Sequence, residues 1–169
     1  MKFKTDKATL LAGIQTVQSV ITPKTALPIL SNILIEAQGG NLKLTATDLD
    51  IGITCVIPVD APENGSITLP AKRFYDIVRE LPVDGVVVTS KKNNIVTIET
   101  AACQFKILGL PKEEFPRLPE FKDKETIKLS QGVLKEMLGL TSFAVSLDET
   151  RYILNGILFK VAKNTLTLV

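Results

Sequence analysis

Histidine and tryptophan are absent from this 169-residue chain. Without histidine the chain cannot form a Ser-His-Asp triad or a zinc site with an imidazole ligand. Cys55 and Cys103 lack the close spacing of metal or redox dithiol motifs, so we expect both thiols to be buried and reduced. No apolar run is long enough to span a membrane, and no signal-peptide pattern follows Met1. These absences remove common parts of enzyme sites and predict a cytoplasmic protein without cofactor or membrane contact.

Strong charge of either sign is also missing. The formal net charge is +2, with 45% apolar and 22% charged residues, and no run of like charges marks a basic arm. Any contact with nucleic acid must therefore come from the local placement of basic side chains. A glycine-rich phosphate loop is absent too, since Gly39-Gly40 separates two predicted strands and does not precede a helix.

The chain contains an internal repeat. A shift of 124 positions places the segment 29–35 on 153–159 without a gap, and apolar positions match on both sides of it. Such a match is expected of a duplicated unit whose buried face alone is constrained. The second copy ends at Val169, which is equivalent to Thr45. The sequence predicts one complete domain over 1–120 and the truncated start of a second over 121–169.

The first copy combines two amphipathic helices with many strands. One helix follows a Thr5/Asp6 cap and ends before Pro23, and the second opens at Pro70. Asn64-Gly65 predicts a hairpin turn between the two strands that flank it. Strands are expected at Lys2–Thr5, Ile29–Ala37, Asn41–Thr47, Gly52–Val59, Gly65–Leu69, Val86–Ser90, Asn94–Glu99 and Cys103–Leu108.

Proline and charged residues predict a linker over Lys112–Glu125. Beyond it we expect a strand at Ile127–Leu129 and a helix behind Ser130. The fold class is α+β, with antiparallel sheets and both helices of a domain on one side of them.

Asp48 and Asp50 form the one acidic pair that suggests chemistry. On an extended segment both carboxylates would face the same way and could hold Mg²⁺ in a phosphodiester or nucleotidyl enzyme. We favour a solvated strand end, because no third acidic residue lies nearby in sequence.

Basic residues occur on each predicted helix and, with Lys24, in the loop after the first helix. Together they could face a phosphate backbone, although ordinary solvated helix faces are the simpler interpretation, because acidic residues accompany each of them. The set comprises Lys7, Lys24, Lys72, Arg73, Arg79 and Lys135.

Five segments resemble, in order and spacing, the bacterial DNA polymerase III beta subunit family, the replicative sliding clamps. They are LPILSNIL at 27–34, LTATDLD at 44–50, LPAKRF at 69–74, FP at 115–116 and RYILNG at 151–156. The resemblance covers the whole chain and identifies it as an N-terminal fragment. It implies a DNA-clamp fold, in which three similar domains per subunit and two subunits close into a ring around duplex DNA.

The resemblance also implies roles for individual residues. The ring's inner helices would turn Lys72, Arg73, Arg79 and Lys135 toward DNA, and Lys24 and Tyr152 match contact positions of relatives. Ile153 stands where relatives often have a second tyrosine. Leu154 matches one wall of the pocket that binds partner peptides, and Arg73, Phe105 and Ile107 match the subunit interface. The implied function is that of a non-enzymatic processivity factor, whose partners are duplex DNA, the polymerase III core, the clamp loader and a second subunit.

Overall fold

The chain divides into two units, Met1–Pro119 and Glu120–Val169, and each is described by itself. The computed structural model describes residues 1–21, 27–82, 85–118 and 127–169. Within these ranges no helix is both long and apolar enough to cross a membrane.

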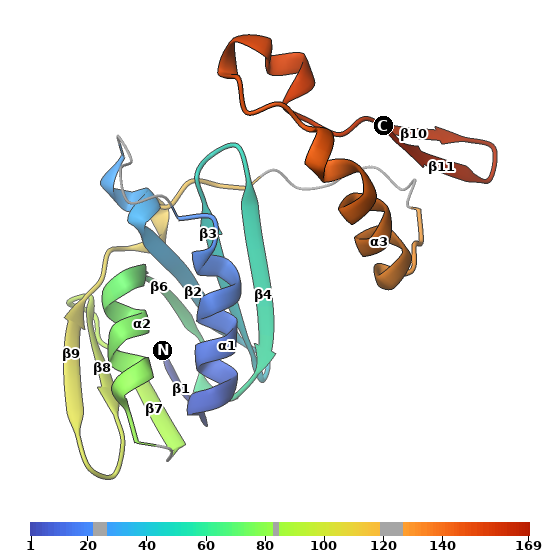
Figure 1. Cartoon of the computed structure of the whole chain (residues 1–169). Coiled ribbons are helices and arrows are strands. Elements are labelled where there is room, and N and C mark those ends of the chain that lie inside the picture. Colours follow the sequence, from blue (N-terminus) through green and yellow to red (C-terminus); the bar gives the residue numbers. More distant parts are fainter. Residues whose placement is uncertain (22–26, 83–84, 119–126) are drawn as a thin grey trace. The chain divides into compact units, whose positions relative to one another are not determined.

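Two antiparallel sheets form the framework of the first unit (Figure 1). The five-stranded sheet has the order β5-β1-β7-β8-β9, so the first strand of the chain is internal to it. The four-stranded sheet has the order β4-β3-β2-β6. The bounds are β1 Lys2–Asp6, β2 Asn32–Gln38, β3 Asn41–Thr47, β4 Gly52–Pro58, β5 Asp60–Glu63, β6 Gly65–Pro70, β7 Gly85–Ser90, β8 Ile95–Glu99 and β9 Gln104–Leu108.

Helices α1 (Lys7–Gln18) and α2 (Ala71–Glu80) lie side by side over the sheets, as the sequence predicts (Figure 1). Asp6 caps α1 by accepting a hydrogen bond from the Thr9 amide at 2.8 Å. Leu10 and Ile14 of α1 and Phe74 of α2 are fully buried. They join the inner faces of both sheets in one apolar core, whose burial is the main stabilising contribution to the unit.

The segment Leu110–Leu118 packs against the four-stranded sheet, so the predicted linker is wrong over Lys112–Leu118. Leu110 exchanges backbone hydrogen bonds with Thr68 on β6, and Lys112 pairs with Glu36 on β2 at 3.5 Å. The segment contains the 3-10 turn η2 (Lys112–Glu114), and Phe115 is 5% exposed. The apolar residues between the prolines hold this stretch to the sheet. The remainder of the predicted linker lies outside the described residues.

The second unit repeats the start of the first. It contains α3 (Gln131–Thr141), the 3-10 turns η3 (Ser142–Ala144) and η4 (Glu149–Leu154), and the hairpin β10 (Phe159–Ala162) with β11 (Thr165–Leu168). A shift of 124 positions turns every β2–β3 pair from Ile35↔Leu44 to Gln38↔Asn41 into the corresponding β10–β11 pair. The repeat found in the sequence is therefore a repeat of register.

The strand expected at Ile127–Leu129 is not formed. Its equivalent, β1, pairs with β5 and β7, and no residues of this chain correspond to those partners in the second unit. An isolated strand without a partner has no ladder of hydrogen bonds to hold it extended.

Three smaller expectations also fail. Asn64-Gly65 makes no hairpin turn, because β5 pairs with β1 in one sheet and β6 pairs with β2 in the other. The expected strand at Ile29 begins only at Asn32, since Pro28–Ser31 forms the 3-10 turn η1. Cys55 and Cys103 are free thiols but only partly buried.

Candidate nucleic-acid interface

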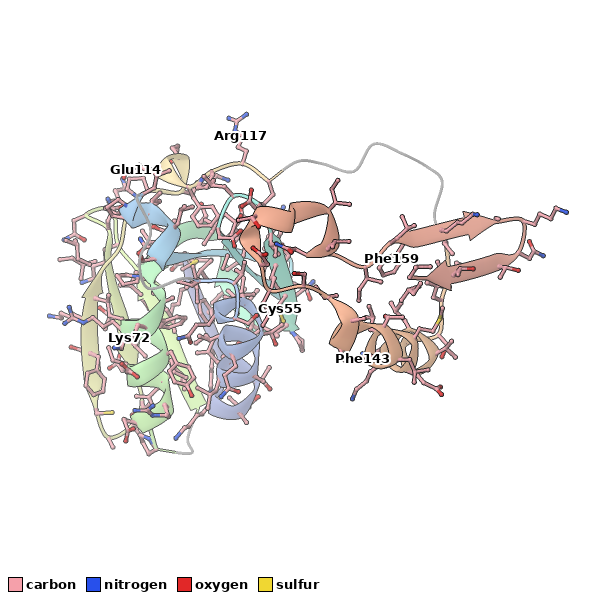
Figure 2. The ribbon with its side chains drawn as sticks, turned by 45° about the horizontal axis from the view of Figure 1, so that its top comes forward. Cys55, Lys72, Glu114, Arg117, Phe143 and Phe159 are labelled. Carbon is pink, nitrogen blue, oxygen red and sulfur yellow. The ribbon has the colours of Figure 1, made fainter. Side chains whose placement is uncertain are left out.

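Lys72 and Arg73 stand on the first turn of α2, directly after Pro70 begins the helix. Both side chains are exposed, because the core-facing positions of this turn are Ala71 and Phe74. Lys72 projects from the helix in Figure 2. No ion pair among the described residues involves Lys72 or Arg73. Their charges are therefore available to an anionic partner.

Arg79 differs from these two, because carboxylates of its own helix hold it. Its guanidinium lies 3.0 Å from Glu80 and 3.7 Å from Asp76. The hydrogen bond to Glu80, with the charges of both carboxylates, raises the pKa of Arg79. The guanidinium also lies over the Tyr75 ring, 5.5 Å from its centroid. With three cations and two carboxylates, α2 carries a net charge of about +1, and both carboxylates lie beside Arg79.

Lys7 and Lys135 occupy different environments. Lys7 donates a hydrogen bond to the Leu81 carbonyl at the end of α2, where a cation also suits the helix dipole. This bond joins the first residue of α1 to the C-cap of α2, which is consistent with antiparallel helices. Lys135 is exposed on α3, next to the exposed Glu136.

The other predicted DNA contacts are placed only in part. Lys24 lies outside the described residues, and so does the side chain of Tyr152, whose backbone belongs to η4. Leu154 ends η4, and its side chain is 54% exposed.

The predicted subunit interface lies on an edge strand. β9 pairs only with β8, so one side of its backbone has no partner strand within the described residues. Phe105 is 38% exposed there, but Ile107 is 2% exposed and belongs to the core. The Ile107 side chain therefore faces inward. A role of Ile107 in the subunit interface stays a prediction, and it would involve the backbone of this edge strand.

Asp48 and Asp50 do not form a two-carboxylate site. They lie in the turn between β3 and β4, where Leu49 has φ 84°, and the extended segment expected there is absent. Oδ1 of Asp48 accepts hydrogen bonds from the backbone amides of Asp50 at 3.0 Å and Ile51 at 2.7 Å. Across the described residues, no group of three or more potential metal ligands occurs. The Asp48 carboxylate thus stabilises the turn.

A shallow hollow between α1 and α2 was not predicted. Gln15 and Gln18 of α1 and its C-cap Ser19 line it together with Tyr75 of α2. The amide of Gln15 donates to the Tyr75 hydroxyl at 3.3 Å. The spacing of three polar residues on one side of an amphipathic helix could have indicated this patch, whereas its partner on α2 follows only from the packing of the helices.

Two family models match the chain. The DNA polymerase III beta subunit, N-terminal domain, matches residues 1–119, and the central domain of the same subunit matches residues 128–169. Among curated relatives, the beta sliding clamp of Chlamydia trachomatis is 37% identical over 169 residues, which are 100% of this chain and 41% of the relative. That of Pseudomonas putida is 34% identical over 170 residues, which cover 100% of this chain and 46% of the relative.

Solved structures agree with these matches. The DNA polymerase sliding clamp of Bacillus subtilis has a TM-score of 0.95 at 33% identity, covering 99% of this chain and 46% of its own. A sliding clamp from Bartonella birtlesii bound to griselimycin has a TM-score of 0.91 at 36% identity, covering 99% and 45%. The chain thus spans less than half the length of the proteins it matches.

Proposed function

This chain belongs to the DNA polymerase III beta subunit family, and we propose that its first unit lays the face of α1 and α2 along the backbone of duplex DNA. The parent protein would close into a ring on DNA and tether the replicative polymerase in the cytoplasm. Such a role requires no reaction by the protein, because encircling the duplex is enough to prevent dissociation.

The unpaired charges of Lys72 and Arg73 are the observation that carries the proposal. Backbone phosphates are recognised chiefly by basic side chains, and these contacts contain no sequence information. With a net charge of about +1 on α2, attraction along this face is weak. Weak, sequence-independent attraction suits a protein that must stay on DNA and still move along it.

The remaining predicted contacts extend the same proposal. Lys24, Arg79 and Tyr152 would add to the DNA-facing surface of the first unit and its neighbour, and Lys135 would do so from α3. Phe105 and Arg73, with the free edge of β9, would meet a second subunit. Leu154 would form one wall of a site for the peptides by which polymerase and clamp loader bind.

Fluorescence anisotropy with a short labelled duplex tests the DNA contact. We expect weak binding at about 50 mM salt that is lost by about 200 mM, since released counterions make each phosphate contact salt-dependent. Replacing both Lys72 and Arg73 by alanine should weaken binding and lower the slope of log K against log salt by roughly 2, about 0.9 for each contact.

Lys43→Ala is the matched control. Lys43 is a lysine of β3 whose neighbours Leu42 and Leu44 are buried, so its side chain faces away from the helices. This variant should keep the slope within the scatter of the wild type. Binding that is tight at physiological salt, or equal slopes for Lys43→Ala and the double variant, would refute the proposed DNA face.

A further inference from the structure

The hollow between α1 and α2 is lined by uncharged polar side chains. Gln15, Gln18, Ser19 and Tyr75 line it, and none of them carries a charge at neutral pH. The guanidinium of Arg79 lies over the Tyr75 ring and is already paired with Glu80 and Asp76. A ligand in this hollow would therefore meet hydrogen-bond donors before it met a free charge.

The hydrogen bond between Gln15 and Tyr75 does not use every donor of these two side chains. Nε2 of Gln15 carries two hydrogens, and the bond to the Tyr75 hydroxyl oxygen uses one of them. Because that oxygen accepts from Gln15, the phenolic hydrogen of Tyr75 is left to donate elsewhere. Ser19 donates to the Thr16 carbonyl at 3.0 Å and so offers its oxygen as an acceptor. Gln15 on α1 and Tyr75 on α2 thus each keep one hydrogen that the bond between them does not use.

The antiparallel packing of α1 and α2 fixes the positions of the side chains that line the hollow. The bond from Lys7 to the Leu81 carbonyl sets one end of the pair, and the bond from Gln15 to Tyr75 sets its middle. The Arg79 guanidinium packs over the Tyr75 ring, 5.5 Å from its centroid. Side chains held in this way lose little further freedom when a ligand binds.

We propose that this hollow receives one backbone phosphate of duplex DNA, which Gln15, Gln18 and Tyr75 hold by neutral hydrogen bonds. The inference rests on the proposed function, because it assumes that the α1–α2 face meets DNA. It adds a second kind of contact to that face. Lys72 and Arg73 attract the duplex by charge, whereas the hollow sets the position at which one phosphate binds. Neutral donors replace water at a phosphate without adding a cation, so they release few counterions.

Salt dependence separates the two kinds of contact. Tyr75→Phe removes only the donating hydroxyl, and Gln15→Ala with Gln18→Ala removes the amides. We expect each of these variants to weaken duplex binding about two- to tenfold, the range of one or two neutral hydrogen bonds. The loss should be the same at each salt concentration, and the slope of log K against log salt should stay at the wild-type value. Gln38→Ala, at an exposed glutamine at the end of β2, is the matched control and should bind as the wild type does.

Each result has one meaning. If Lys72 and Arg73 matter but Tyr75→Phe and the glutamine variants bind like the wild type, the phosphate hollow is wrong and the DNA face stands. A change of slope in the glutamine variants would likewise overturn a neutral contact. If the wild type binds no duplex at about 50 mM salt, both proposals fail. Inorganic phosphate at millimolar concentration should not displace the duplex, because a single neutral hollow holds a free ion weakly; displacement would make this a site for the free anion.

Discussion

Asp48 shows how one side chain can support a strained turn. Its carboxylate accepts from the amides of Asp50 and Ile51. Leu49, between Asp48 and Asp50, has a positive φ that non-glycine residues rarely adopt. The hydroxyl of Thr47 adds bonds to the Leu49 amide and the Ile51 carbonyl. The pattern that suggested a metal site in the sequence is therefore a set of turn contacts.

Asp48→Ala should destabilise the first unit by about 1 kcal/mol, because two backbone amides lose their acceptor. Urea unfolding would measure this. Asp50→Ala, at the exposed neighbour, is the control and should change stability by less than about 0.5 kcal/mol. A rise of the melting temperature with Mg²⁺ that depends on both carboxylates would instead restore the metal-site hypothesis.

Asp6 makes the stability of α1 depend on pH. Its bonds to the amide and hydroxyl of Thr9 hold the pKa of the Asp6 carboxyl below its ordinary value of 3.8. A carboxyl with a lowered pKa stabilises the folded state above the unfolded pKa, and this contribution is lost as the pH falls through the lower folded value. The melting temperatures of wild type and Asp6→Ala should therefore differ at pH 6, and the difference should shrink as the pH falls below 3.8. A difference that stayed constant over this range would show that the cap acts without its charge.

At the scale of elements, the segment Leu110–Leu118 belongs to the fold of the first unit. The Leu118 side chain lies so close to Gly52 that a Cβ there would be 2.9 Å from it. Together with the bonds to Thr68 and Glu36, this contact carries the segment from β6 across β2 to the start of β4. The connection to the second unit therefore starts after Leu118.

Phe115→Ala should cost roughly 3 kcal/mol, since a nearly buried aromatic ring leaves a cavity that the sheet cannot fill. The midpoint of urea unfolding of the first unit would report it. Phe143→Ala removes the same ring from a site that is 84% exposed, and it should leave that midpoint unchanged (Figure 2). Equal midpoints for Phe115→Ala and the wild type would mean that the segment does not support the sheet.

Local patterns predicted most elements of the first unit, because each helix and most strands carry their own periodicity and turns. β5 was missed, since its four residues include Pro62 and it pairs only at the edge of a sheet. Which sheet a strand joins is decided by partners far away in sequence, and so Asn64-Gly65 looked like a hairpin turn. Exposure of Lys72 and Arg73 followed from helical spacing, whereas the pairing of Arg79 and the contact of Gln15 with Tyr75 depend on side-chain geometry and helix packing.

At the scale of the whole molecule, the two units bury equivalent residues to different degrees. Ile35 of β2 is fully buried, while Phe159, its equivalent in β10, is 50% exposed. Where the structure describes side chains of the second unit, only Leu168 is buried. The two hairpins thus share one register, but the residues of β2 and β3 pack into a core and most of those of β10 and β11 stay exposed.

Hydrogen exchange should therefore distinguish amides that the repeat makes equivalent. Those of β2 and β3 should be protected to the level of global unfolding, and those of β10 and β11 should exchange through local opening. Equal protection at low concentration would mean that the second unit has a stable core of its own.

Phe159 and Val161 form an exposed apolar face on β10. If this face associates with a second copy, as exposed strands with free edges do, raising the chain concentration should increase the protection of amides in β10 and β11. Sedimentation would show the same association directly. Phe159→Ser, which places a hydroxyl on that face, should reduce it, while Lys163→Ser in the hairpin turn serves as the control. A monomer at every concentration would refute association through this surface.

The internal place of β1 in its sheet has a consequence for synthesis on the ribosome. β1 emerges first, yet β7, its longest partner, begins at Gly85, 79 residues after Asp6. At roughly 5 to 20 residues per second, this strand waits about 4 to 16 s before its ladder with β7 can form. Phe3 is the one apolar side chain among Lys2–Asp6, and two lysines flank it. The nascent strand is thus poorly suited to pair with other chains during this delay, and the five-stranded sheet closes only late in translation of the first unit.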